Sequence, residues 1–219
     1  MKVGTDGVLL GSWTDVENAS RILDVGTGSG LIALMLAQRS NAIIDGVEIE
    51  KNACLQSRKN AAASPWHNRI NLYHDSIQHF SETTSLRYNV IVSNPPYFQN
   101  SLKPPVRSRS MAKHNVGLDY SMLLSCSSKL LLPGGRLSII IPAGDKKQFA
   151  IEADFHHLQP SRLTWVRPAT VKENSRCLME FKAMAGIACD ENELIIRNDD
   201  LKTYSENYIR LTKDFYLGF

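Results

Sequence analysis

Cysteine is scarce and scattered in this chain of 219 residues. The four cysteines form no CxxC pair, which excludes both a zinc-ribbon spacing and the dense disulfide framework of a small secreted domain. They are Cys54, Cys126, Cys177 and Cys189. Sparse cysteine is typical of a reducing compartment, so we expect a cytoplasmic protein. His74 and the pair His156–His157 have no partners at metal-ligand spacing, and we expect no bound metal.

Long hydrophobic runs are also missing. The longest unbroken apolar run, residues 31–37, is far shorter than the about 20 residues that a membrane-spanning helix needs. The short apolar cluster at residues 8–10 follows Asp6 and is shorter than the core of a signal peptide. The sequence therefore predicts a soluble protein with no membrane partner.

Charge is distributed unevenly around a net value of +3. Residues 183–219 hold seven acids and four bases, a balance of −3, which leaves +6 for residues 1–182. A basic front half is compatible with a nucleic-acid partner, although a charge excess is more often a solvated face.

Apolar β-branched runs alternate with helix-period stretches in the first two thirds of the chain, which is typical of βαβ units and a parallel sheet with helices on both faces. The pattern predicts strands at 21–25, 42–48, 69–73, 88–93 and 136–141, and helices at 31–39, 50–63, 120–131 and 145–153. Segments 161–166 and 176–181 are expected to form an antiparallel pair at the edge. Apolar residues at 204, 208, 211 and 215 predict a C-terminal helix that packs on the body.

A glycine-rich loop follows the first predicted strand. Its sequence runs from Asp24 through Gly26, Gly28 and Gly30, directly before the helix that begins at Leu31. Glycines allow tight turns and close approach to a ligand, and a helix N-terminus favours negative groups. The spacing G-x-G-x-G differs from the dinucleotide fingerprint G-x-G-x-x-G, so a nicotinamide cofactor is disfavoured.

An acid stands at the end of the second predicted strand. Glu48 follows Gly30 by eighteen residues, where a carboxylate can accept both hydrogen bonds of a ribose diol. Glu50 is the competing candidate, but the last inward position of the strand suits Glu48 better. Alternatively, Glu48 is an acid in the first turn of the next helix, where the helix dipole favours it.

The fourth predicted strand runs into Asn94, Pro95, Pro96 and Tyr97. The prolines stiffen the turn, so the Asn94 side-chain oxygen and the Pro95 carbonyl can be held as a pair of acceptors, with the ring of Tyr97 as a stacking face. Two fixed acceptors and a flat ring suit a planar amine whose nitrogen attacks an electrophilic methyl group. The alternative is a plain Pro-Pro turn that ends a strand.

A stretch without acids follows this turn and contains Lys103, Arg107, Arg109, Lys113 and His114. Basic residues beside a reactive corner favour a polyphosphate substrate such as RNA. A solvated loop with accidental charge is the alternative.

DVGTGSG, VEIE and HDSI together resemble the motif series of class I S-adenosylmethionine-dependent methyltransferases. The resemblance implies a Rossmann-like α/β fold with a mostly parallel seven-stranded sheet, an antiparallel edge strand and helices on both faces. It also implies that the glycine loop holds the methionine part of S-adenosylmethionine, that Glu48 holds the ribose and that Asp75 reaches the adenine. Taken alone, Asp75 could equally be a turn residue or a helix N-cap.

NPPY resembles the motif of methyltransferases that act on exocyclic amines of bases and on glutamine amides. The opening MKVGTDGVLLG and the closing LTKDFYL narrow this to a resemblance to bacterial tRNA adenine N6-methyltransferases that modify adenosine 37 of valine tRNA. It implies that Thr5, Asp6 and Gly7 pack over the cofactor, that S-adenosylhomocysteine is the product, and that residues 1–219 form one domain. Members usually carry about two dozen further residues before this opening, as a basic arm of the kind used on nucleic acid, and this sequence lacks them.

Two other functions stay open at this stage. A protein-glutamine methyltransferase shares NPPY, and a non-catalytic RNA-binding module with a relic cofactor pocket belongs to a different class. The basic stretch and both termini favour the tRNA enzyme over the protein-glutamine methyltransferase. The intact motifs favour it over the non-catalytic RNA-binding module. The sequence leaves the oligomeric state open, with a monomer expected.

Overall fold

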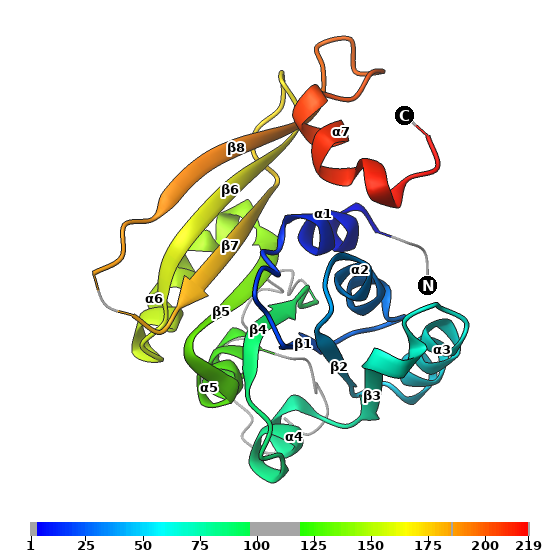
Figure 1. Cartoon of the computed structure of the whole chain (residues 1–219). Coiled ribbons are helices and arrows are strands. Elements are labelled where there is room, and N and C mark those ends of the chain that lie inside the picture. Colours follow the sequence, from blue (N-terminus) through cyan, green and yellow to red (C-terminus); the bar gives the residue numbers. More distant parts are fainter. Residues whose placement is uncertain (1–3, 97–118, 185, 219) are drawn as a thin grey trace, which may run out of the picture.

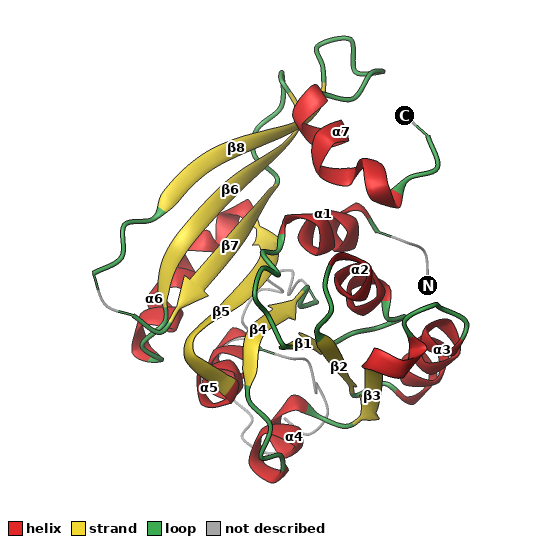
Figure 2. Cartoon of the chain, in the orientation of Figure 1, coloured by secondary structure: helices red, strands yellow, loops and turns green. Residues whose placement is uncertain are grey.

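The computed structural model describes residues 4–96, 119–184 and 186–218 of the chain. Helices and strands alternate through the first part and give way to three strands and a short helix near the C-terminus (Figure 2). The helices are α1 (Thr5–Trp13), α2 (Leu31–Arg39), α3 (Lys51–Ala62), α4 (Ile77–Thr83), α5 (Tyr120–Leu130), α6 (Lys146–Phe155) and α7 (Glu206–Thr212). The strands are β1 (Arg21–Val25), β2 (Ile43–Glu48), β3 (Ile70–His74), β4 (Tyr88–Ser93), β5 (Leu131–Pro142), β6 (Gln159–Ala169), β7 (Arg176–Lys182) and β8 (Asp190–Arg197).

All these strands join one sheet in the order β3-β2-β1-β4-β5-β7-β6-β8 (Figure 1). Strands β1 to β5 are mutually parallel, and β7 runs antiparallel to both of its neighbours, β5 and β6. The direction in which successive strands are added to the sheet reverses at β1, which has β2 on one side and β4 on the other. In open α/β sheets ligands bind at the carboxyl ends of the strands beside such a switch point.

Helices cover both faces of the sheet and enclose two apolar cores. One core holds buried residues of α1, α2 and α7, and the other holds those of α4, α5 and α6 (Figure 1). Successive strand residues alternate between them, so that Ile22 faces the first core while Leu23 and Val25 face the second. The central strands β1 and β4 are mostly apolar because both of their faces are buried.

The observed sheet confirms the doubly wound α/β class, with one difference from expectation. The described residues form eight strands rather than seven. The expected antiparallel pair is present as β6 and β7, and the additional strand β8 lies outside it at the edge. The extra strand β8 begins with exposed polar residues, DEN, and therefore carries little apolar signal. Strand β7 can lie inside because Cys177, Leu178, Met179 and Phe181 are all completely buried.

Two further helices were not expected. In α1 every residue from Gly7 to Trp13 is buried, so the helix has no polar face and no amphipathic period. Close packing on α2 explains this composition, because a Cβ at Gly11 would lie 2.8 Å from Met35 Sδ. Helix α4, the second unexpected helix, is short and spans only Ile77–Thr83. The C-terminal helix α7 packs on the body as expected, with Tyr208 buried beside α1 and α2.

Candidate active site

The glycine loop joins β1 to α2 and adopts a backbone that side chains disfavour. Gly26, Gly28 and Gly30 have φ values of +71°, +58° and +83°, in the left-handed region that glycine enters without strain. The amides of Gly26 and Thr27 donate to the carbonyl of Val47 at 2.9 and 3.2 Å, which anchors the loop on the end of β2. A Cβ at Gly26 would meet nothing within 4 Å, so the loop has an open side on which a ligand can rest.

Asp24 is completely buried at the end of β1, beneath this loop. Its Oδ2 accepts hydrogen bonds from Thr27 Oγ1 at 2.6 Å and from the Ala33 amide at 3.2 Å. Its Oδ1 is buried and has no hydrogen-bond partner within the described part of the chain. Burial raises the pKa of Asp24 to about 7, against the lowering effect of the two hydrogen bonds. An unpaired buried acceptor of this kind suits a cationic or hydrogen-bonding group of a ligand.

Glu48 ends β2 and bridges two segments of backbone. Its Oε2 accepts from the Gly28 amide and its Oε1 from the Glu50 amide, both at 2.8 Å. The competing acid, Glu50, is the N-cap of α3 and accepts from the amides of Asn52 and Ala53 at 3.1 and 2.7 Å. The geometry therefore assigns Glu50 to the helix and places Glu48 at the loop.

Asp75 follows β3 and also belongs to this edge, because its amide donates to the Glu48 carbonyl at 3.1 Å. Its Oδ2 lies 2.7 Å from His79 Nδ1, and its Oδ1 accepts from the Ser76 amide at 2.7 Å. The hydrogen bond and the charge of Asp75 raise the pKa of the exposed His79 ring. The N-cap of α4 is Ser76, so Asp75 is not the helix cap.

The carboxyl end of β4 carries the turn that begins with Asn94. Ser93, the last strand residue, donates from Oγ to the Val25 carbonyl at 2.9 Å, which fixes this corner beside the end of β1. Asn94 is half-buried, Pro95 is buried and Pro96 is exposed. Tyr97 and the basic residues Lys103, Arg107, Arg109 and Lys113 lie outside the described residues.

The first turn of α1 lies against the helix that follows the glycine loop. A Cβ at Gly7 would lie 3.1 Å from Leu31 Cδ2, so the two helices touch where α2 begins. Thr5 is exposed, and Asp6 forms an ion pair with Arg176 at 3.0 Å. The pairing of Asp6 with Arg176 and of Asp75 with His79 was not predicted, because sequence spacing does not indicate either contact.

Asp24, the glycine loop, Glu48, Asp75 and Asn94 thus lie at the carboxyl ends of four neighbouring strands. These residues fit S-adenosylmethionine, since the open loop and the unpaired Asp24 oxygen offer a cradle and an acceptor. Over the described ranges we find no group of His, Cys, Asp and Glu that could hold a metal ion. In the same ranges no helix is long and apolar enough to cross a membrane.

Comparison with known proteins agrees with this geometry. The chain is 47% identical over 218 residues to a tRNA1(Val) (adenine(37)-N6)-methyltransferase of Phocaeicola vulgatus, a match that covers 100% of this chain and 92% of the relative. A protein of that name from Aeromonas hydrophila is 45% identical, over 99% of this chain and 91% of its own length.

Solved structures show the fold at lower identity. A predicted O-methyltransferase from Agrobacterium tumefaciens has a TM-score of 0.76 at 18% identity, covering 95% of this chain and 96% of its own. A 16S rRNA N2 G1207 methyltransferase from T. thermophilus, solved with AdoMet and guanosine, has a TM-score of 0.58 at 19% identity. The match covers 84% of this chain and 44% of that chain. The family model of the methyltransferase small domain matches residues 4–162. With that match and these relatives, the chain belongs to the methyltransferase small domain family and is an S-adenosylmethionine-dependent enzyme.

Proposed function

We propose that this enzyme methylates the exocyclic N6 amine of an adenine in tRNA, at adenosine 37 of valine tRNA. The names of relatives that match the whole chain at 40–47% identity support this substrate. The observation that carries the chemistry is the Asn94-Pro95-Pro96 turn, which leaves β4 beside the glycine loop and is tied to the end of β1 through Ser93.

The turn supplies acceptors for a planar amine. The Asn94 side-chain oxygen and the Pro95 carbonyl accept the two N–H bonds of the adenine amine and direct its lone pair. Acceptor dipoles in a partly buried corner also stabilise the positive charge that develops on nitrogen as it is alkylated. When bound, S-adenosylmethionine would supply an electrophilic methyl group. As the N6–C bond forms, the sulfonium C–S bond would break to give S-adenosylhomocysteine, and the positively charged N6, a strong acid, would lose one proton to water. Positioning therefore replaces a strong general base.

The residues around the loop hold the cofactor. The backbone of the glycine loop and the Asp24 carboxyl face the methionine part, where an ammonium group can pair with the free Asp24 oxygen. Glu48 accepts from the ribose hydroxyls, and Asp75 accepts from the adenine amino group.

The nucleotide reaches this corner only when it leaves its stack. We place the stacking face at Tyr97 and the phosphate contacts at Lys103, Arg107, Arg109 and Lys113, which are proposals from the sequence. We take residues 1–219 as a single domain that acts in the cytoplasm on tRNA, as a monomer and without a metal ion.

The decisive experiment incubates the enzyme and cofactor with unmodified valine tRNA and, separately, with a glutamine-containing peptide. Mass spectrometry of nucleosides and peptides then identifies the methylated product. N6-methyladenosine at position 37 supports the proposal, and N-methylglutamine would move the chain to the rival activity. Cofactor binding by calorimetry without transfer to either substrate would contradict both.

A variant pair tests the role of Asn94. Asn94→Ala removes one acceptor, and we expect turnover to fall on the order of a hundredfold or more while cofactor still binds. The matched control is Asn89→Ala on the same strand, because Asn89 Oδ1 accepts from the amides of Ser20 and Arg21 at the opposite end of β4. The control should lose stability and keep its turnover number. Similar turnover in both variants would contradict the acceptor mechanism.

A further inference from the structure

Helix α1 is held firmly at its C-terminal end, far from the proposed cofactor site. Arg39 donates to the carbonyls of Gly11 and Thr14 at 2.6 and 2.8 Å, and Arg162 donates to the Trp13 carbonyl at 3.1 Å. These bonds satisfy carbonyls that the helix itself leaves unpaired, and the cations suit the negative end of its dipole. The C-terminal end of α1 is thus fixed by arginines of α2 and β6.

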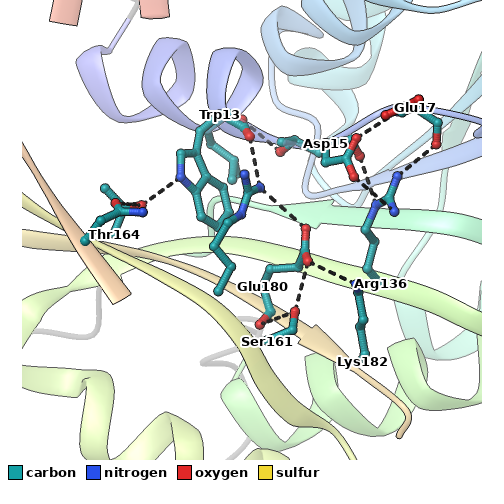
Figure 3. A network of polar contacts seen from close by, with 12 residues as sticks. Trp13, Asp15, Glu17, Arg136, Ser161, Thr164, Glu180 and Lys182 are labelled. Atoms are coloured by element: carbon teal, nitrogen blue, oxygen red, sulfur yellow. Dashed lines mark hydrogen bonds and ion pairs between the residues drawn. The ribbon is translucent and has the colours of Figure 1, made fainter. Parts of the chain in front are cut away.

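A polar network extends this anchor into the sheet (Figure 3). The guanidinium of Arg162 stacks over the ring of Trp13 with its Cζ 3.7 Å from the centroid, and it pairs with the buried Glu180 of β7 at 3.4 Å. Trp13 donates from Nε1 to Thr164 Oγ1 at 2.9 Å. Arg136 of β5 donates from Nε to the Asp15 carbonyl at 3.0 Å. These contacts anchor this end of the helix on the sheet.

The N-terminal end of α1 is joined to the opposite end of the same strands. Arg136 and Arg176 mark the two ends of the β5–β7 ladder, since Arg136 pairs with Lys182 and Pro142 pairs with Arg176. Asp6, in the first turn of α1, forms its 3.0 Å ion pair with Arg176 there. Helix α1 therefore runs along the ladder from the carboxyl end of β5, where Asp6 meets Arg176, to the amino end of β5, where Arg136 meets Asp15.

Two consecutive residues of this first turn contact two different parts of the proposed site. Asp6 forms its ion pair with β7, which lies beside β5 on the side where we propose that the substrate binds. Gly7 packs on Leu31 at the start of α2, on the side where we propose that the cofactor binds. The Arg176 guanidinium is itself steadied by its bond from Nη1 to the Ser175 carbonyl at 2.9 Å. A shift of this turn would move Gly7 relative to Leu31, the first residue after the glycine loop.

We propose that Arg176 is a positioning residue for cofactor binding that acts through Asp6. It holds the first turn of α1 against α2, and so sets the geometry of Thr5, Asp6 and Gly7 at the cofactor. Asp6 and Arg176 are 24% and 30% exposed, and an ion pair of such exposure contributes little to global stability. Its effect is therefore on the position of the turn. This inference rests on the proposed cofactor contacts of α1.

The chain offers a matched control in Arg167. Its ion pair with Glu193, at 2.6 Å, has side chains that are 31% and 36% exposed, and it joins β6 to β8 without involving α1. Arg176→Ala and Arg167→Ala thus remove the same kind of side chain from pairs of similar exposure. We expect similar small shifts of the thermal midpoint from both.

The two variants should differ in cofactor binding measured by calorimetry without RNA. We expect Arg176→Ala to weaken S-adenosylmethionine on the order of tenfold, and Arg167→Ala to change it less than about twofold. The charge-swapped double variant Asp6→Arg/Arg176→Asp should bind more tightly than either single change. If the swap does not fold, Arg176→Lys provides the test. Its affinity for S-adenosylmethionine should stay within about threefold of that of the unmodified protein, because the positive charge is kept.

Wild-type affinity in Arg176→Ala, or equal losses in both alanine variants, would overturn the inference. The inference would also be overturned if the swap bound no more tightly than the single variants and Arg176→Lys lost affinity as Arg176→Ala does. The calorimetric readout also separates this inference from the proposed function. An unmodified protein that binds cofactor but transfers no methyl group to adenine would refute the substrate and leave the role of Arg176 to be judged by the variants.

Discussion

Glu48 accepts a 2.8 Å hydrogen bond from the amide of Gly28, so the acid at the end of β2 directly holds the glycine loop that follows β1. Its other oxygen accepts from the Glu50 amide at 2.8 Å, and the side chain is 9% exposed. The carboxylate that we propose accepts from the ribose therefore also orders the glycine loop. Loss of Glu48 removes both effects together.

The first prediction concerns the two neighbouring acids. Glu48→Ala should weaken cofactor binding by about 1.5 to 3 kcal/mol, the range for hydrogen bonds to a charged group. Glu50→Ala is the matched control, because it removes the N-cap of α3 and should lower stability with little change in affinity. Calorimetry and urea unfolding measure the two quantities. Equal losses of affinity in both variants would contradict the assignment of Glu48.

A second prediction follows from the pKa of Asp24, which burial raises to about 7. Between the unfolded pKa of 3.8 and about 7, the folded protein holds a proton that the unfolded chain has lost, so stability falls as pH rises through this window. Asp24→Asn should remove that slope. Urea unfolding at several pH values checks it, and an unchanged slope in the variant would refute the assignment.

Cofactor binding should show the opposite trend at the same residue. A cationic ammonium group pairs with the ionised form of Asp24, so the affinity for S-adenosylmethionine should rise as pH increases through about 7. The rise should be smaller in Asp24→Asn, which cannot ionise. Calorimetry across this range measures it, and parallel pH profiles for the two proteins would speak against contact between Asp24 and the cofactor.

A third prediction concerns the pair of Asp75 and His79, 2.7 Å apart. Asp75 raises the pKa of His79 above its ordinary 6.5, so the pair stabilises the fold fully below 6.5 and loses this effect as pH rises through the raised value. Asp75→Asn should lower the pKa of His79 in an NMR titration. Bound cofactor should also lower it if the adenine engages the Asp75 carboxylate; no response to cofactor would argue against that contact.

A fourth prediction compares two glycines of the loop. A Cβ at Gly30, where φ is +83°, would lie 3.2 Å from Ser57 Cβ, whereas one at Gly26, where φ is +71°, meets nothing within 4 Å. Both alanine variants should lose about 1 to 2 kcal/mol through the left-handed backbone. Gly30→Ala should lose more stability because α3 must move, and Gly26→Ala should lose more cofactor affinity because its methyl group enters the cradle. The reverse ranking would contradict the open side of the loop.

Much of the fold could be predicted because its signals are local. The β1–loop–α2 unit appears in the sequence as a β-branched strand, three closely spaced glycines and an apolar helix, and the predicted bounds of β1, α2 and β4 agree with the structure. Helix α1 could not be predicted this way, since burial on all sides removes the amphipathic period. Strand β8 was missed because its first residues are exposed and polar, and only pairing with β6 makes it a strand.

The periods of strands and helices place Asp24, Glu48, Asp75 and Asn94 at element boundaries, so the chemical groups at the ends of the strands can be identified from the amino-acid pattern alone. The partners of these groups become visible only in the folded chain. The tertiary structure assigned Glu50 to a helix cap and Glu48 to the loop, paired Asp75 with His79, and brought Asp6 to Arg176 across 170 positions of sequence. Periodicity reports which face of an element is buried, whereas the partner of a charged side chain is set by how distant elements pack, and no local pattern encodes that.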